Sequence, residues 1–289
     1  VLHRRHRGPM GCHPRVRPMH EVVVGALLGT VGAMYARGAS VVAGRSAQAR
    51  HGLSVACFAA GWLALALALL SPLDEIAEQL FSAHMVQHEL IMIIGAPLIV
   101  IARPMPTILW AFSRRWRHAI GRLIHAHGIR SAWHRATGPF AACLIHGVVI
   151  WTWHIPSLFQ LTLHSEVVHA VQHFSFFGSA VLFWWSVIHV HARSRRGTAI
   201  ISLFATAIHT SVLGALLTFS PTPWYPYYGS LGGRWGLSPI ADQQLAGLIM
   251  WIPGSVAYLV ACLSVAYRYL RESEWTVAEA ERALMAAAQ

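Results

Sequence analysis

Two copies of one histidine motif carry the strongest chemical signal in this chain. The pattern His-x-Val-Gln-His begins at His84 and again at His169, so the copies end at His88 and His173. Both copies lie in stretches apolar enough to cross a bilayer, where a histidine is costly and usually has a partner or a function. Residues three and four apart share one helix face. Each motif therefore offers two imidazoles and one amide from the same face of a helix.

Histidine pairs with this spacing indicate a site for a metal ion or a haem. Neutral imidazole is a donor that suits copper, zinc and iron, and an i, i+4 pair can supply two nitrogen atoms to one ion. The glutamines of the two motifs, Gln87 and Gln172, could fix the histidine tautomers from a second layer. Glu89 projects about 100° away from His88 on a helix, which makes it a further second-layer candidate or a proton acceptor.

The composition is that of an integral membrane protein. The chain is 55% hydrophobic and 11% charged, whereas a soluble domain carries about 25% charged residues. Its formal net charge of +11 comes from arginine alone. The arginines lie in loops between apolar spans, which is a membrane topology signal rather than a nucleic-acid-binding surface. The four cysteines form no C-x-x-C pair, so we expect no disulfide framework.

The hydropathy pattern predicts an all-α polytopic membrane helix bundle of about seven transmembrane helices. The predicted spans are 21–36, 52–71, 76–101, 138–158, 167–190, 198–219 and 243–270, within a transmembrane domain at 19–271. The Pro- and Gly-rich stretch 220–240 reads as a long loop. Residues 272–289 are predicted to form a short cytoplasmic helix, because Thr276 and Glu279 make a capping box.

The arginine-rich loops place one side of the bundle in the cytoplasm. Loops 37–50, 103–135 and 193–196 and the segment after 268 all fall on one side of a seven-span protein. This predicts a multi-pass protein of the bacterial inner (plasma) membrane with a cytoplasmic C-terminus. The basic residues 1–18 would break the rule, so we expect a disordered tail or a true start at Met10 or Met19.

Residues 106–127 form a segment with apolar side chains at helical spacing and basic side chains between them. This pattern predicts an amphipathic helix in the lipid interface.

This topology gathers polar side chains from five spans in the outer leaflet. His154 lies near the outer end of the fourth span, His209 leans outward in the sixth, and Asp242 opens the seventh. His146 lies deeper and is better read as a packing residue. The candidate metal ligands are His84, His88, His154, His169, His173 and His209. The candidate second-layer residues are Gln87, Gln172, Glu89 and Asp242.

Four stretches of the sequence resemble the CtaG-type cytochrome c oxidase assembly factors, and the resemblance runs from about Val22 to Arg271. The stretches are Ser71–Asp74, Phe81–Glu89, Ala96–Leu98 and Ala241–Trp251. The resemblance implies a multi-span membrane protein that is needed to make active haem-copper oxidase, through copper delivery or maturation of the metal centres. It implies a polar core formed by His84, His88, His169, His173 and Asp242.

Three functions follow from these observations. The first is an assembly factor that binds copper near the periplasmic face and passes it to a cytochrome c oxidase subunit or another copper-handling assembly protein. The second is a b-type haem protein for electron transfer, because histidines at equal depth on two parallel helices can ligate one haem. The third is a structural partner of an oxidase subunit, or a metal permease, which would need polar groups continuing to the cytoplasmic side. We do not expect an enzyme, because no nucleotide site or nucleophilic triad is visible.

Overall fold

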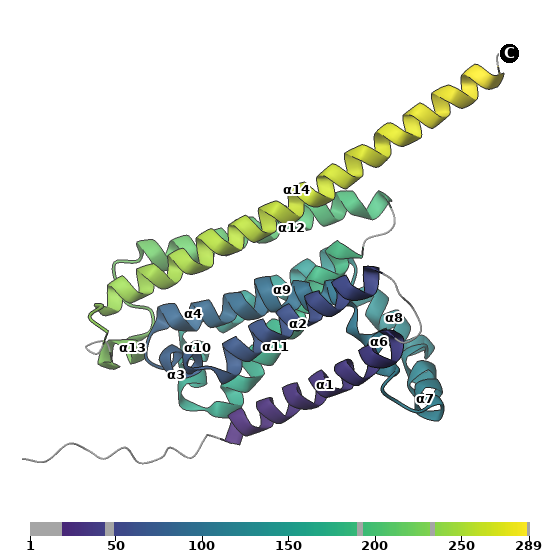
Figure 1. Cartoon of the computed structure of the whole chain (residues 1–289). Helices are drawn as coiled ribbons and strands as arrows, with labels where there is room; N and C mark the ends of the chain where they lie inside the picture. Colours follow the sequence, from purple (N-terminus) through teal and green to yellow (C-terminus); the bar gives the residue numbers. More distant parts are fainter. Residues whose placement is uncertain (1–18, 44–48, 190–192, 232–234, 288–289) are drawn as a thin grey trace, which may run out of the picture.

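The structure, a computed structural model, describes residues 19–43, 49–189, 193–231 and 235–287 of the chain. Within these ranges the regular elements are all helical, which confirms the predicted all-α fold. The predicted basic tail, residues 1–18, lies outside the described residues. The long helices run side by side in a bundle, with short helices at both ends (Figure 1).

Six helical segments of the described chain are long and apolar enough to span a membrane, or up to seven if a bent pair is one span. They are α1 (Met19–Ala43), α2 (Ala49–Leu70), the composite segment Phe81–Ala102, α11 (Glu166–Ile188), α12 (Arg193–Phe219) and α14 (Pro239–Ala287). The bent pair is α8 (His127–Ala136) with α9 (Pro139–Trp153), which meet at 73°. Large apolar side chains such as Phe174 and Ile201 are exposed on the outside of the bundle, as lipid contact requires.

The predicted fourth span, 138–158, ends earlier than expected. Helix α9 stops at Trp153, and a separate helix, α10 (Pro156–His164), follows it. The residue before a proline is pushed out of the helical region by the pyrrolidine ring. Ile155 accordingly adopts ψ 124°, so the chain turns at this point and α10 starts in a new direction.

The predicted third span, 76–101, is divided into four elements. The short helix α3 (Pro72–Ala77) ends just inside the predicted span, and extended backbone at Leu80 (φ −128°, ψ 126°) separates it from α4 (Phe81–Glu89). A π-helical segment, η1 (Leu90–Gly95), then leads into α5 (Ala96–Ala102). A π-helical turn leaves the normal backbone pattern and is frequent at functional sites. The indole N–H of Trp184 donates to the carbonyl oxygen of Met92 at 2.8 Å, which satisfies one backbone acceptor of this segment.

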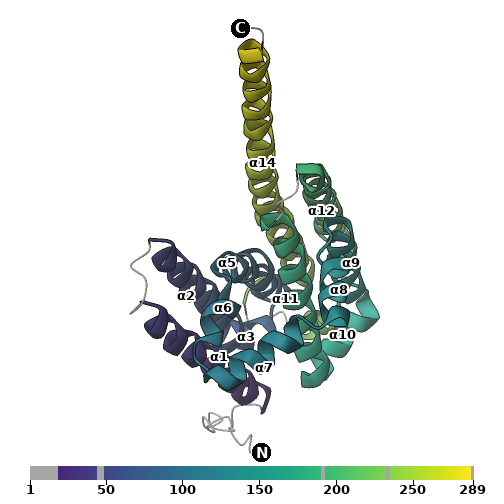
Figure 2. The same ribbon diagram turned by 90° about the vertical axis from the view of Figure 1, so that its right-hand side faces the viewer.

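Helices α12 and α14 pack closely along their length. A Cβ atom on Gly214 would lie 2.8 Å from the Cβ of Trp251 and 2.9 Å from the carbonyl oxygen of Gly247. Only glycine therefore allows this approach. At the other end of the pair, Arg196 of α12 forms an ion pair with Glu272 of α14. Helix α14 continues unbroken to Ala287 and projects beyond the bundle (Figure 2), so residues 272–287 continue α14 and are not a separate short helix.

The short helices lie at the two ends of the bundle (Figure 1). Helices α3, α10 and α13 (Pro226–Leu231) lie at one end, so the predicted long loop 220–240 contains a short helix. Helices α6 (Pro104–Leu109), α7 (Arg114–Ile124) and α8 lie at the opposite end. The predicted amphipathic segment 106–127 is thus divided over α6, α7 and the start of α8.

Candidate metal centre

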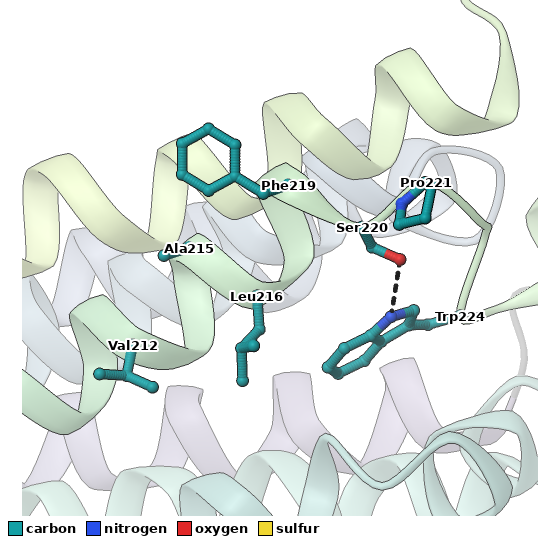
Figure 3. Close-up of a pocket in the computed structure, with 7 residues that line it drawn as sticks. All are labelled: Val212, Ala215, Leu216, Phe219, Ser220, Pro221 and Trp224. Carbon is teal, nitrogen blue, oxygen red and sulfur yellow. Dashed lines mark hydrogen bonds between the residues drawn. The ribbon is translucent and has the colours of Figure 1, made fainter.

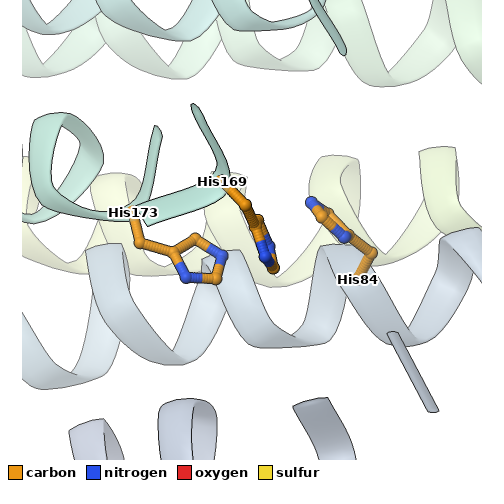
Figure 4. Close-up of side chains that lie close together, drawn as sticks. All are labelled: His84, His169 and His173. Carbon is orange, nitrogen blue, oxygen red and sulfur yellow. The ribbon is translucent and has the colours of Figure 1, made fainter. Parts of the chain in front are cut away.

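Three histidines from two helices lie close enough to hold one metal ion. His84 of α4 and His169 and His173 of α11 each offer a ring nitrogen, and the three nitrogen atoms lie within 4.8 Å of one another. Figure 4 shows the three rings side by side between the two helices. Because both motifs are helical, the i, i+4 spacing places His169 and His173 on the same face, as the sequence predicts.

His88 lies one turn further along α4 and joins the same group of rings. Its ring centroid is 4.4 Å from that of His84 and 5.5 Å from that of His173. The His169 and His173 centroids are 4.2 Å apart. The two His-x-Val-Gln-His motifs therefore form one group of four imidazoles, which we call the histidine quartet.

His154 is held in the tautomer that a metal ligand needs. Its Nδ1 atom lies 2.7 Å from the carbonyl oxygen of Ile150, and a carbonyl can only accept, so Nδ1 carries the proton. The Nε2 atom is left with its lone pair, and it is buried without a hydrogen-bond partner. His154 is close enough to interact electrostatically with His84 and His88. A backbone carbonyl that fixes the tautomer in this way is typical of metal-ligating histidines.

The donor atoms of the quartet fit a bound cation. His84 and His88 are each 1% exposed. The Nε2 atom of His84 and both ring nitrogens of His88 have no hydrogen-bond partner among the described residues. A buried polar atom left unsatisfied costs about 1–3 kcal/mol, and native proteins keep few of them. A metal ion bound by these nitrogen atoms would remove that cost.

His209, the sixth predicted ligand, lies apart from the quartet. Its Nδ1 atom accepts a hydrogen bond from the indole of Trp151 at 3.3 Å. Its Nε2 atom faces the backbone of α9, 3.3 Å from where a Cβ on Gly147 would lie. The ring is therefore on the α9–α12 contact. His146, the predicted packing residue, is hydrogen-bonded at both nitrogens, to Ser179 and Tyr258.

Two of the predicted second-layer residues hold the backbone of the site instead of a histidine. Gln87 donates from its amide nitrogen to the carbonyl oxygen of Ala68 at 2.7 Å and to the carboxylate of Asp74 at 2.6 Å. Asp242 accepts from the first two backbone N–H groups of α4. Sequence reasoning missed the role of Asp74, although it lies in one of the four stretches that carry the family resemblance.

The other two second-layer candidates lie on different sides of the quartet. Gln172 is fully buried and lies beside His84. Glu89 is also buried, but its carboxylate faces α14, with one oxygen 3.5 Å from where a Cβ on Gly254 would lie. Their roles toward a metal stay predictions.

The comparison with protein families agrees with these residues. The family model of the cytochrome c oxidase caa3 assembly factor, Caa3_CtaG, matches residues 33–272. The chain belongs to this family. The matched region contains both histidine motifs, His154, Asp74 and Asp242.

Two curated relatives of this assembly-factor chain come from mycobacteria. They are the uncharacterized protein Mb0105 of Mycobacterium bovis and the uncharacterized protein MT0111 of Mycobacterium tuberculosis, and each is 23% identical to this chain over 273 residues. The match covers 89% of this chain and 40% of each relative. The chain therefore spans less than half the length of these proteins. No solved structure matches the chain.

In this member of the assembly-factor family, an aromatic cap covers the quartet on the side of α10 and α13. The cap consists of Phe81, Phe159, Tyr225 and Tyr228, which are 0–3% exposed. The ring of Phe159 lies 5.0 Å from that of His84 and 4.3 Å from that of Tyr225. The cap thus packs directly against His84.

Both tyrosine hydroxyls of the cap are hydrogen-bonded to backbone. Tyr225 donates to the carbonyl oxygen of His154 at 2.9 Å, and Tyr228 donates to that of Ala77 at 3.1 Å. Burial raises the pKa of both phenols, and the nearby Asp242 carboxylate raises that of Tyr228 further. Both groups therefore stay protonated and keep donating, which holds the cap closed over the site.

Proposed function

We propose that this chain is a membrane assembly factor for haem-copper cytochrome c oxidase that binds copper at the histidine quartet, for delivery or for maturation of a metal centre. The observation that carries the proposal is the group formed by His84, His169 and His173, with three ring nitrogens within 4.8 Å of one another. The oxidase enters the proposal through the family, which is described as an assembly factor of cytochrome c oxidase. An oxidase subunit, or another copper-handling assembly protein, would be the partner.

The chemistry of the donors supports a singly charged copper ion. The residues that could ligate the metal in this group are all histidines, and imidazole is neutral when it ligates a metal. The charge of the ion is then not cancelled by its ligands. The cost of burying a charge grows steeply with its magnitude, so neutral nitrogen donors favour Cu(I) over a divalent ion. When bound, the copper is the cargo, and the histidines hold and release it.

The packing of the histidines disfavours both alternatives, a bound haem and a metal path across the membrane. A porphyrin needs an open slot between its two axial ligands, but the quartet rings lie against one another with centroids as close as 4.2 Å. A permease would need free donors deeper in the bundle. His146, the nearest deeper histidine of α9, is already hydrogen-bonded at both ring nitrogens.

We further propose that the protein lies in a bacterial plasma membrane with the quartet toward the periplasm. The arginine-rich helices α7 and α8 lie at the opposite end of the bundle from α10 and α13 (Figure 1). Positive residues favour the cytoplasmic side. In this orientation the quartet would release copper toward the periplasmic side of the membrane.

Metal analysis of the purified protein tests the proposal. Wild-type protein loaded with Cu(I) under reducing conditions should keep about one copper per chain, and the His84→Ala/His169→Ala variant should keep none. The matched control is His118→Ala/His125→Ala, which removes two exposed histidines at the opposite end. If the wild type keeps no copper under reducing or oxidising conditions, the proposal is wrong. A Soret band in the optical spectrum would favour the haem alternative.

In cells, the same variants separate copper handling from a structural role. Loss of cytochrome c oxidase activity in the His84→Ala/His169→Ala strain, with normal amounts of the assembly factor in the membrane, is the expected result. Normal oxidase activity in that strain would mean that the protein assists assembly without its histidines.

A further inference from the structure

Helices α7 and α8 form an exposed surface at the end of the bundle opposite α3, α10 and α13 (Figure 1). We call these two helices, Arg114–Ile124 and His127–Ala136, the α7–α8 surface. Trp116, Ile120 and Leu123 recur at i, i+4 and i+7, so they lie on one side of α7. Arg114 and Arg122 lie on the other side of the same helix.

The apolar side of this surface is not covered by the protein. Neither α7 nor α8 contains a buried residue. Trp116 is 63% exposed and Leu123 is 61% exposed. Isolated helices of this length are marginal in water, because packing of the apolar face supplies most of a helix's stability. An apolar medium outside the protein must therefore cover this face.

The polar side carries positive charge without compensation. The two helices contain six arginines and no acidic residue. The arginines are Arg114, Arg115, Arg117, Arg122, Arg130 and Arg135. Arg117 lies over the ring of Trp110, with its guanidinium carbon 4.2 Å from the ring centroid. Guanidinium groups bind phosphate oxygens through paired hydrogen bonds.

We propose that the α7–α8 surface binds anionic phospholipids of the membrane leaflet at this end of the bundle. Trp116, Ile120 and Leu123 enter the acyl-chain boundary, and Arg114 and Arg122 contact the headgroup phosphates. A basic amphipathic helix of this kind binds the interface through buried apolar area and attraction to anionic lipid. The surface thereby anchors the loop between α5 and α9. The inference does not depend on copper binding by the quartet.

Selective lipid association tests this proposal on the whole protein. The full chain is reconstituted in phosphatidylcholine bilayers, and its association with spin-labelled phosphatidylglycerol is compared with that of spin-labelled phosphatidylcholine. The wild type should prefer the anionic lipid. The Arg114→Gln/Arg122→Gln variant should lower that preference by about fivefold for each arginine removed, the ratio that corresponds to roughly 1 kcal/mol per arginine near an anionic surface.

The matched control removes the same charge from another helix. Arg268→Gln/Arg271→Gln changes two exposed arginines of α14 and should lower the preference much less. An equal loss in both variants would mean that net charge, and not the α7–α8 surface, selects the lipid. A wild type without preference for phosphatidylglycerol would overturn the proposal and favour an acidic protein segment as the occupant.

Discussion

The carboxylate of Asp242 caps the helix that begins at Phe81. Its two oxygens accept from the backbone N–H groups of Phe81 at 2.7 Å and Ser82 at 3.0 Å, across 161 and 160 positions of the chain. Helix α4 has no side-chain cap of its own at Leu80. The first turn of α14 therefore supplies the cap, and a negative charge at a helix N-terminus is also favoured by the helix dipole. His84 lies one turn inside this capped end.

Removal of the Asp242 cap should weaken both the fold and the metal site. Asp242→Ala is expected to lower the free energy of unfolding by about 1–2 kcal/mol, the usual cost of losing a cap. It should also weaken copper binding by roughly tenfold, because partners that orient ligands contribute about that much. Thermal unfolding and a Cu(I) competition titration measure the two effects. Asp242→Asn keeps one acceptor and should recover part of both, and unchanged copper affinity in Asp242→Ala would show that the cap does not position His84.

The two glutamines of the repeated motif should respond differently to substitution. Gln87 makes two buried hydrogen bonds, to Ala68 and Asp74, so Gln87→Leu should cost about 1–3 kcal/mol of stability per unsatisfied group. Gln172 has no such pair of bonds and lies beside His84. Gln172→Leu should therefore leave the unfolding temperature closer to that of the wild type and change copper affinity instead. The same loss of stability in both variants would contradict this division.

Sequence patterns predicted where the spans lie, because a membrane-spanning helix is recognised from one continuous stretch of apolar residues. The predicted second span, 52–71, begins three residues after the helix α2 (Ala49–Leu70) and ends one residue after it. The break before Phe81 was missed, because α4 starts where Asp242, distant in sequence, provides its cap. The π-helical segment was missed for a related reason, since the indole that donates to its Met92 carbonyl belongs to α11, which is distant in sequence.

The helix face on which each pair of motif histidines lies could be predicted, but the direction of every histidine ring could not. Helical spacing placed the two motif histidines of each span on one face, and the structure brings all four together. The rotation of α12 about its own axis depends on its packing against α9 and α14. That packing turns His209 toward Gly147 and Trp151, away from the quartet.

Copper binding should distinguish His173 from His209. His173→Ala removes one of the three close donors and should weaken copper binding by more than about 100-fold, since loss of even an outer partner costs roughly 10–100-fold. His209→Ala should leave copper affinity and stoichiometry unchanged, because its ring lies against α9. The measurement is Cu(I) competition with a chromophoric chelator. Weakened binding in both variants to the same degree would place His209 in the ligand set.

The glycine contact between α12 and α14 should be intolerant of a side chain. A Cβ on Gly214 would lie 2.8 Å from the Cβ of Trp251. Neither helix backbone can move away without disturbing the packing of α12 against α14. Gly214→Ala should therefore lower the free energy of unfolding by about 1–3 kcal/mol, as overpacking does. Gly178→Ala is the matched control, because a Cβ there meets no atom within 4 Å. Thermal unfolding in detergent compares the two, and equal stability would show that α12 and α14 can separate freely.

A mainly apolar pocket lies beside the C-terminal end of α12. Figure 3 shows Val212, Leu216 and Trp224 on its wall, with the indole N–H of Trp224 donating to Ser220 at 3.0 Å. The backbone N–H of Trp224 donates to the side chain of Gln243 at 2.6 Å. These bonds hold the segment that leads into Tyr225, so the aromatic cap is tied to both α12 and α14.

The aromatic cap should control how fast copper leaves the quartet. His84 and His88 are each 1% exposed, and the cap ring of Phe159 packs against His84, so we expect release from these two histidines to require the cap to open. Tyr225→Phe removes the hydrogen bond to the His154 carbonyl while keeping the ring. Loss of one such bond costs about 1 kcal/mol, so release to a chelator should be about fivefold faster with unchanged stoichiometry. Tyr227→Phe, on the neighbouring residue outside the cap, is the control for stopped-flow release. Equal release rates in the wild type and Tyr225→Phe would mean that copper leaves by another route.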